Sequence, residues 1–75
     1  MENHMDKTQK NLLRSYIMRS NYENERVLAK VVLNITGVSF SRKVNGHNEF
    51  TAVEIQKLKE KLNIPDKDVI AIFLR

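Results

Sequence analysis

Apolar residues recur every three or four positions along most of this chain, a spacing that predicts α-helices. The first helix is expected to begin at a cap formed by Asp6 or Thr8 and to end near Arg19. Its apolar positions are Leu12, Leu13, Tyr16, Ile17 and Met18. Residues 1–6 precede this pattern, and we expect them to be disordered.

A second helix is predicted over about residues 25–33, after a turn that contains Asn21 and Asn24. Its apolar positions are Val27, Leu28, Val31 and Val32. Three of these are β-branched, which lowers helix propensity, and the run from Val31 to Leu33 could also form a buried strand. The chain offers no second strand of alternating polarity to pair with it, so the helix is favoured.

Residues 33–46 predict a tight turn followed by a short helix with a polar outer face. Thr36 suits the N-cap, because its hydroxyl can accept a backbone N–H of the first turn. Phe40 and Val44 lie four positions apart, so they share one face and can anchor the helix to a core. Gly46 suits the end of the helix, since glycine tolerates a positive φ angle. The other faces carry Ser39, Ser41, Arg42 and Asn45.

A fourth helix is predicted to begin at Thr51 and to end near Leu62, because Thr51 and Glu54 have the spacing of a capping box. The residues that it should bury are Ile55, Leu58 and Leu62. Asn63 suits the C-cap of this helix.

A fifth helix is predicted to begin with Pro65, Asp66 and Asp68 in its first turn and to continue to the end of the chain. Residues 69–74 are all apolar, and six consecutive apolar residues of a short helix cannot all face one core. We therefore expect an exposed apolar patch that serves as a dimer interface. The residues assigned to this interface are Ile70, Phe73 and Leu74.

The composition fits a single all-α domain, residues 1–75, with one small core. The chain has no cysteine for a disulfide scaffold or a zinc ribbon, which points to a reducing cytosol. No apolar run approaches the roughly 20 residues of a membrane-spanning helix, so no membrane association is expected. The N-terminus also lacks the apolar stretch of a secretory signal.

The formal net charge of +4 is concentrated in one part of the sequence. Residues 26–48 contain four basic residues and no acidic residue, whereas nine basic and nine acidic residues occupy the rest of the chain. The four are Arg26, Lys30, Arg42 and Lys43. Such an asymmetry favours a polyanionic partner such as nucleic acid.

Residues that could carry catalysis are too few for an enzyme. The two histidines are His4, in the predicted disordered end, and His47, in a predicted loop. Neither has a spacing to Ser and an acid that would support nucleophilic catalysis, and no glycine-rich phosphate loop is present. We expect no catalytic residue, no metal and no cofactor.

Two helices joined by a short turn, the second of them capped and polar outside, predict a helix-turn-helix. Asn34 would take the turn position where Gly is common, and Ile35 would fill the turn. The segments Leu33-Asn34-Ile35-Thr36, Phe40-Ser41-Arg42-Lys43-Val44-Asn45-Gly46, Glu49-Phe50-Thr51 and Glu54-Ile55 resemble the small Cro/CI-type, lambda-repressor-like regulators of phages and prophages. The likeness covers about residues 26–74. The run from Ser41 to Gly46, followed by Glu49-Phe50-Thr51, is similar to a subgroup of this family found in phages of Gram-positive bacteria.

The resemblance implies a compact five-helix bundle that binds an operator in double-stranded DNA as a homodimer, with residues 36–44 in the major groove. It implies a Cro-like repressor of transcription in the bacterial host cytosol, associated with the nucleoid. The residues that would read bases are Gly37, Val38, Ser41 and Arg42. The residues that would lie near phosphates are Arg26, Lys30, Thr36, Ser39, Lys43, Asn45, His47 and Asn48.

One position departs from the family pattern. The family has a small residue four places before the turn glycine, where the two helices touch, but Lys30 stands four places before Asn34 and Ala29 stands one place earlier. Either the second helix contains one extra residue, or it is rotated from the usual packing. Gly37 could supply the close approach from the other helix.

A different class of function uses the same fold. The chain could be a regulator that binds another protein, such as a phage repressor, and acts as a repressor modulator, antirepressor or antitoxin. The exposed apolar tail expected at Ile70, Phe73 and Leu74 suits this alternative as well as it suits a homodimer.

Overall fold

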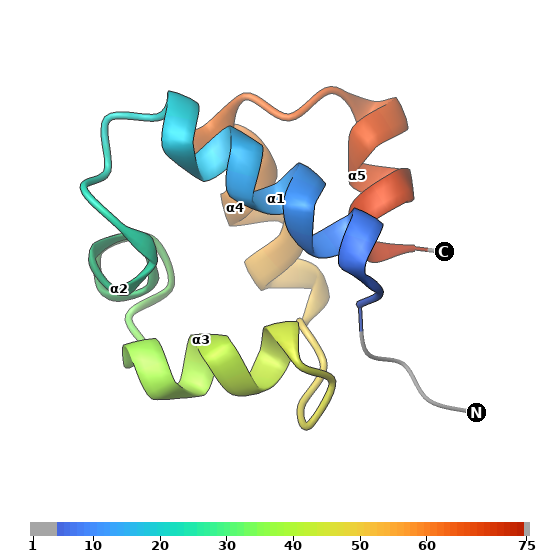
Figure 1. Cartoon of the computed structure of the whole chain (residues 1–75). Helices are drawn as coiled ribbons and strands as arrows, with labels where there is room; N and C mark the ends of the chain where they lie inside the picture. The colour runs from blue at the N-terminus through green and yellow to red at the C-terminus, as the bar shows by residue number, and fades with distance from the viewer. Residues whose placement is uncertain (1–4, 75) are drawn as a thin grey trace.

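The computed structural model describes residues 5–74, and these form an all-helical fold (Figure 1). The helices are α1 (Lys7–Arg19), α2 (Glu25–Leu28), η1 (Ala29–Leu33), α3 (Gly37–Val44), α4 (Ala52–Leu62) and α5 (Asp66–Phe73). Because η1 continues α2 without a break, the described residues contain five separate helices, as the sequence predicted. None of the helices in this part of the chain is long and apolar enough to cross a membrane.

The first helix begins in a capping box that also joins it to the last helix. Asp6 is the N-cap, and its carboxylate accepts the Gln9 N–H at 2.8 Å while the Gln9 side chain accepts the Asp6 N–H at 2.8 Å. Gln9 then donates from Nε2 to the Ile72 carbonyl of α5 at 2.8 Å. Met5 is buried in the core. The prediction of disorder is therefore wrong for Met5 and Asp6, while residues 1–4, including His4, lie outside the described residues.

The core lies between the helices and is made of aliphatic residues together with Phe40, which is almost fully buried. Its buried members are Met5, Leu13, Ile17, Leu28, Ala29, Val32, Leu33, Phe40, Val44, Leu58, Leu62, Ile64, Val69 and Ile72. Phe50 stands between two other rings, with its centroid 5.8 Å from that of Phe40 and 5.3 Å from that of Phe73, both edge to face. The aromatic contacts tie α3, the loop before α4 and α5 together.

Several apolar positions lie farther out than the sequence predicted. Met18 follows the buried Ile17 and is exposed, so it does not belong to the buried stripe of α1, and Val31, one of the apolar positions of the second helix, is exposed on η1. Ile35 and Ile55 are only half-buried at the edge of the core. In α5, Pro65 is the N-cap rather than a residue of the first turn.

The second half of the α2–η1 helix is a π-helical turn. The Asn34 N–H donates to the Ala29 carbonyl five residues back, which is the bond that defines a π-turn, and also to the Lys30 carbonyl at 3.1 Å. The Ile35 N–H donates to the same Ala29 carbonyl at 3.2 Å. A π-turn contains one residue more than an α-helical turn. The helix therefore holds one residue more than a regular α-helix would, with Ala29 fully buried and Lys30 exposed, as the first of the two alternatives for Lys30 supposes.

Candidate nucleic-acid interface

The helix α3 is fixed at both ends and on one face, as predicted. The Thr36 hydroxyl accepts the Ser39 N–H at 3.1 Å, which caps the first turn. Phe40 and Val44 are buried beneath the helix. Gly46 has φ of 85°, and this turn lets the chain fold back over the last carbonyls of the helix.

A close approach between α2 and α3 is made possible by Gly37. A Cβ atom on Gly37 would lie 3.0 Å from Cγ and 3.3 Å from Cβ of Arg26. These distances are shorter than ordinary van der Waals contacts, so glycine at this position lets the first turn of α3 rest on Arg26. This contact agrees with the expectation that Gly37 supplies the closeness between the two helices.

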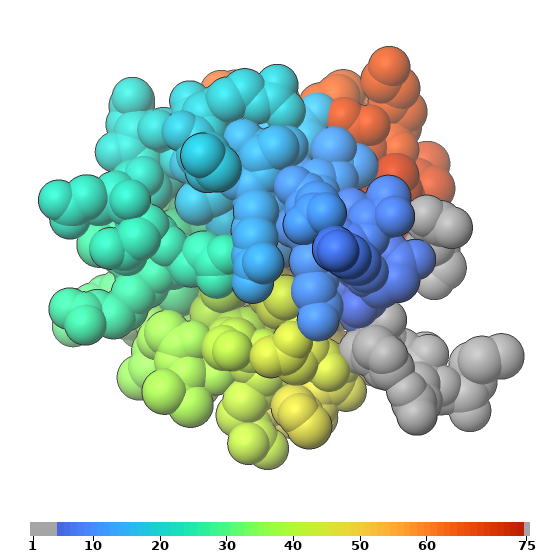
Figure 2. Space-filling view, viewed as in Figure 1, coloured from blue at the N-terminus to red at the C-terminus, as the bar shows by residue number. Residues whose placement is uncertain are grey.

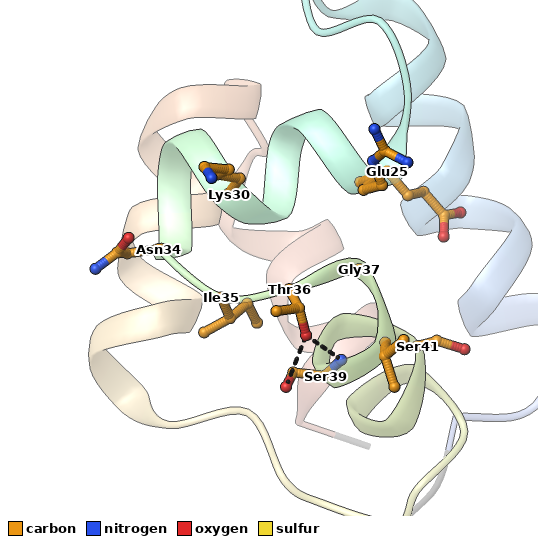
Figure 3. Close-up of a pocket in the computed structure, with 10 residues that line it drawn as sticks. Glu25, Lys30, Asn34, Ile35, Thr36, Gly37, Ser39 and Ser41 are labelled. Carbon is orange, nitrogen blue, oxygen red and sulfur yellow. Dashed lines mark hydrogen bonds between the residues drawn. The ribbon is translucent and has the colours of Figure 1, made fainter.

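An open groove of about 1070 Å³ runs between the α2–η1 helix and the N-terminal half of α3 (Figure 3). Seven of the residues that the sequence assigned to nucleic acid line it: Arg26, Lys30, Thr36, Gly37, Val38, Ser39 and Ser41. Glu25, Asn34 and Ile35 also line it and were not predicted as site residues. The groove therefore gathers residues from both sides of the turn around Asn34, which has φ of 57°, as predicted for this position.

The other predicted site residues lie at the C-terminal end of α3, away from this groove. Arg42 is exposed, and its carbonyl accepts the N–H groups of His47 at 2.9 Å and of Asn48 at 3.4 Å. The side chains of His47 and Asn48 are exposed on the loop. Asn45 is the C-cap and donates from Nδ2 to the Ser41 hydroxyl at 3.4 Å.

Lys43 differs from the other predicted phosphate ligands because its side chain turns inward. Its Nζ lies 3.1 Å from the Glu54 carboxylate and donates to the Glu49 carbonyl at 3.0 Å. The side chain is only 14% exposed, and Nζ lies 6.0 Å from the centre of the Phe50 ring. A contact to phosphate would require these interactions to break.

The same pair changes the acidity of Glu54. Partial burial acts to raise the pKa of this carboxyl, but the hydrogen bond from the Thr51 backbone N–H and the Lys43 ammonium lower it by more. The pKa of Glu54 therefore lies below its ordinary value. The carboxylate stays charged, and it keeps the charge of Lys43 compensated.

Residues 26–48 contain no acidic residue, but acidic residues from outside this range lie beside them in the fold. Glu25 lines the groove, and its carboxylate accepts from Arg14 Nε at 3.0 Å. Among the residues that the structure describes, Arg26, Lys30 and Arg42 have no carboxylate within ion-pair distance. These three, and not the four that the sequence indicated, are the uncompensated cations of residues 26–48.

The apolar tail is exposed in part. Ile70 is 55% exposed and Leu74 is 62% exposed. Phe73 is partly buried because its ring packs against Phe50. Of the three residues assigned to a dimer interface, two are therefore open to solvent and the third supports the fold.

Sequence reasoning missed Glu25 and Lys10 at the candidate interface. Glu25 directly precedes Arg26, so its position could have been inferred once α2 was placed beside α3. Lys10 belongs to α1, 35 residues before Asn45 in the chain, and donates to the Asn45 side-chain oxygen at 3.0 Å. No local sequence signal connects these two residues.

The rest of the described surface offers little for other chemistry. No group of three or more His, Cys, Asp or Glu residues in the described part of the chain is placed to hold a metal ion. A smaller hollow of about 340 Å³ lies between the end of α1 and the end of α4. Comparison of the chain with models of known protein families, with curated proteins and with solved structures finds no match.

Proposed function

We propose that this protein is a sequence-specific DNA-binding regulator of transcription. In this proposal, α2–η1 and α3 form a helix-turn-helix, and α3 enters the major groove of an operator. The observation that carries the proposal is the outer face of α3: it exposes Val38, Ser41 and Arg42, it bears no acid, and both ends of the helix are fixed. A short rigid helix of this kind fits the width of the major groove.

The exposed side chains of α3 suit the edges of base pairs. Val38 is 72% exposed and offers an apolar group to a thymine methyl. Arg42 can donate two hydrogen bonds to the acceptors of guanine, and Ser41 can bond to several bases. Arg26 and Lys30, across the groove, supply cations for the flanking phosphates.

The proposal includes a homodimer and a Cro-like repressor role. Three uncompensated cations per chain from residues 26–48 support only modest binding to phosphates at physiological salt, and a dimer doubles them. Ile70 in α5 and Leu74 at its C-cap are exposed apolar residues four positions apart that a second copy could cover. Because Phe73 packs against Phe50, the test substitution is Ile70→Asp, which we expect to yield a monomer in sedimentation velocity while the wild type is a dimer.

The direct test measures binding to the DNA that flanks the protein's own gene, by gel shift and fluorescence anisotropy. We expect the wild type to bind one site in this DNA more tightly than a scrambled duplex. Arg42→Ala should remove this preference, because each lost base contact reduces discrimination by about 1–3 kcal/mol. Thermal melting should show that the variant remains folded, since Arg42 is exposed.

The matched control is Lys61→Ala, which removes one exposed cation from the C-terminal end of α4. This end of α4 lies far from α3 (Figure 1). We expect Lys61→Ala to bind the site like the wild type. If Arg42→Ala kept the preference for the site, the assignment of the reading face would be wrong.

A protein-binding regulator is the second candidate, and the exposed Ile70 and Leu74 favour it. Salt separates the two functions. Binding to DNA should weaken steeply as salt rises, because counterions are released when cations meet phosphates. An apolar contact with a protein should respond little to salt, so a complex that survives high salt would support the alternative.

A further inference from the structure

Lys10 reaches from α1 to the end of the proposed reading helix. Its Nζ donates to Asn45 Oδ1 at 3.0 Å, and Asn45 Nδ2 donates to the Ser41 hydroxyl at 3.4 Å. The two bonds connect α1 to the outer face of α3. Figure 2 shows the blue side chains of α1 meeting the yellow-green end of α3 on one face of the molecule.

The partner of Lys10 is a neutral amide. Within the part of the chain that the structure describes, no carboxylate lies within ion-pair distance of Lys10 Nζ. Its ammonium therefore keeps a full, uncompensated charge beside α3. The side chain is partly buried, which directs the charge toward the C-terminal end of α3.

Lys43 presents the opposite arrangement at the same end of α3. Its ammonium is held by Glu54 at 3.1 Å and by the Glu49 carbonyl at 3.0 Å, and the side chain is largely covered. Glu54 also accepts the Thr51 N–H at 2.9 Å, so the pair links the end of α3 to the start of α4. The loop that carries His47 and Asn48 lies between these two points.

We propose that Lys10 is a phosphate ligand of the DNA-binding surface and that Lys43 is a positioning residue. Lys10 adds a fourth uncompensated cation, at the C-terminal end of α3, where the sequence had placed Lys43. Lys43 instead holds the loop of residues 45–50 against α4. The inference rests on the proposed function, because it names the residue that meets the backbone of the same DNA.

The experiment measures the slope of log K against log salt for a fluorescein-labelled duplex from the DNA flanking the gene. Each phosphate contact contributes about 0.9 to this slope, so a dimer that loses one contact per chain loses about 1.8. We expect Lys10→Gln to lower the slope by this amount. Lys61→Gln, the matched change at an exposed lysine of α4, should leave the slope unchanged.

Lys43→Met keeps the apolar stem of the side chain and removes the ammonium. We expect it to weaken binding without changing the slope, because a positioning residue contributes no released counterion. The double variant Lys43→Met/Glu54→Gln removes both charges of the pair, so it keeps the test valid if Lys43→Met alone does not fold. An unchanged slope in Lys10→Gln, or a lower slope in either Lys43 variant, would overturn the inference.

The failure of the proposed function would look different. In that case the wild type itself would show no salt-dependent preference for any part of the flanking DNA. If the wild type binds with a steep slope and Lys10→Gln has the same slope, the DNA-binding function stands and the role assigned to Lys10 is wrong.

Discussion

Two helices of this protein end in similar sequences, identical at four of seven positions, but in different hydrogen-bond patterns. Residues 29–35 and 58–64 each have Lys at the second position and Leu-Asn-Ile at the last three. Both asparagines are left-handed, with φ of 57° at Asn34 and 55° at Asn63. Yet the Ile64 N–H reaches back five residues, to Lys59, and the Ile35 N–H reaches back six, to Ala29.

The difference lies in which positions of each helix end are buried. The segment η1 packs against both α3 and α4, and it buries Val32 as well as Leu33. At the end of α4 the residue that corresponds to Val32 is Lys61, which is exposed. The wider turn of η1 accompanies the wider buried face, so the same stop signal serves two geometries.

Deleting one residue from each of these two segments should have the most different effects on stability. Glu60 and Val31 hold the same position, three places before the asparagine, and both are exposed. Deleting Glu60 from the regular helix α4 would turn Leu62 and Ile64 away from the core by about 100°. Each such loss costs about 2–5 kcal/mol, so we expect no cooperative thermal transition.

Deleting Val31 should be tolerated, because it converts the π-turn to a regular α-helical turn with Ala29 four places before Asn34. We expect its free energy of unfolding, measured by urea denaturation followed by circular dichroism, to lie within about 1 kcal/mol of the wild-type value. A loss as large as that for the Glu60 deletion would show that Val31 is not the extra residue.

Substitutions at Ala29 and Leu58, the first residues of the segments 29–35 and 58–64, should have the next largest effects on stability, because both residues are fully buried. Leu58→Ala leaves a cavity and should lower the free energy of unfolding by about 2–5 kcal/mol. Ala29→Leu adds volume where the helix meets its neighbours and should lower it by about 1–3 kcal/mol. Denaturation in urea measures both values. If Ala29→Leu were neutral, close packing at Ala29 would not explain the small residue there.

Substitutions of the two asparagines should have similar effects on stability. Asn34→Ala and Asn63→Ala place a Cβ-bearing residue that lacks a polar side chain in the left-handed region, at a cost of about 1–2 kcal/mol each. Asn34→Gly and Asn63→Gly should stay close to the wild type, since glycine adopts this conformation freely. Melting temperatures of the four variants would test this expectation, and clearly unequal losses for the two alanine variants would contradict a shared stop signal.

The N-terminal caps of the same two helices should differ in their response to acid. Helix α4 uses the charged capping box of Thr51 and Glu54, whereas α2 uses the neutral side chain of Asn24. Because the pKa of Glu54 is lowered in the folded state, its contribution is present above the ordinary value of 4.5 and is lost as the pH falls through the folded pKa.

We therefore expect the wild type to lose stability below about pH 4.5, and Glu54→Gln to lose less over the same range. The effect should be the smallest of the set, because one partly exposed ion pair contributes little. Chemical denaturation at pH 3, 4, 5 and 7 measures it. Asn24→Ala is the control, since it should lower stability equally at every pH, by about 1 kcal/mol.

Local sequence signals predicted most of the helices but not all of their contacts. The caps at Thr36 and Thr51, the left-handed Asn34 and the buried faces of α3 and α4 follow from side chains within four residues of each other. Physical effects of that range act within one segment, so they can be inferred from the sequence. Met18 and Val31 belong to the apolar pattern of the sequence yet are exposed, because apolar character alone does not fix the face on which a residue lies.

The candidate site divides in the same way. The pattern of residues was enough to predict which helix is short, capped and basic, and which residues anchor it. Packing between distant helices sets the contacts of Lys43 with Glu54, of Lys10 with Asn45 and of Phe73 with Phe50. Partners of this kind are distant in the chain and come together only when whole helices pack, so the direction of a charged side chain depends on its neighbours in space.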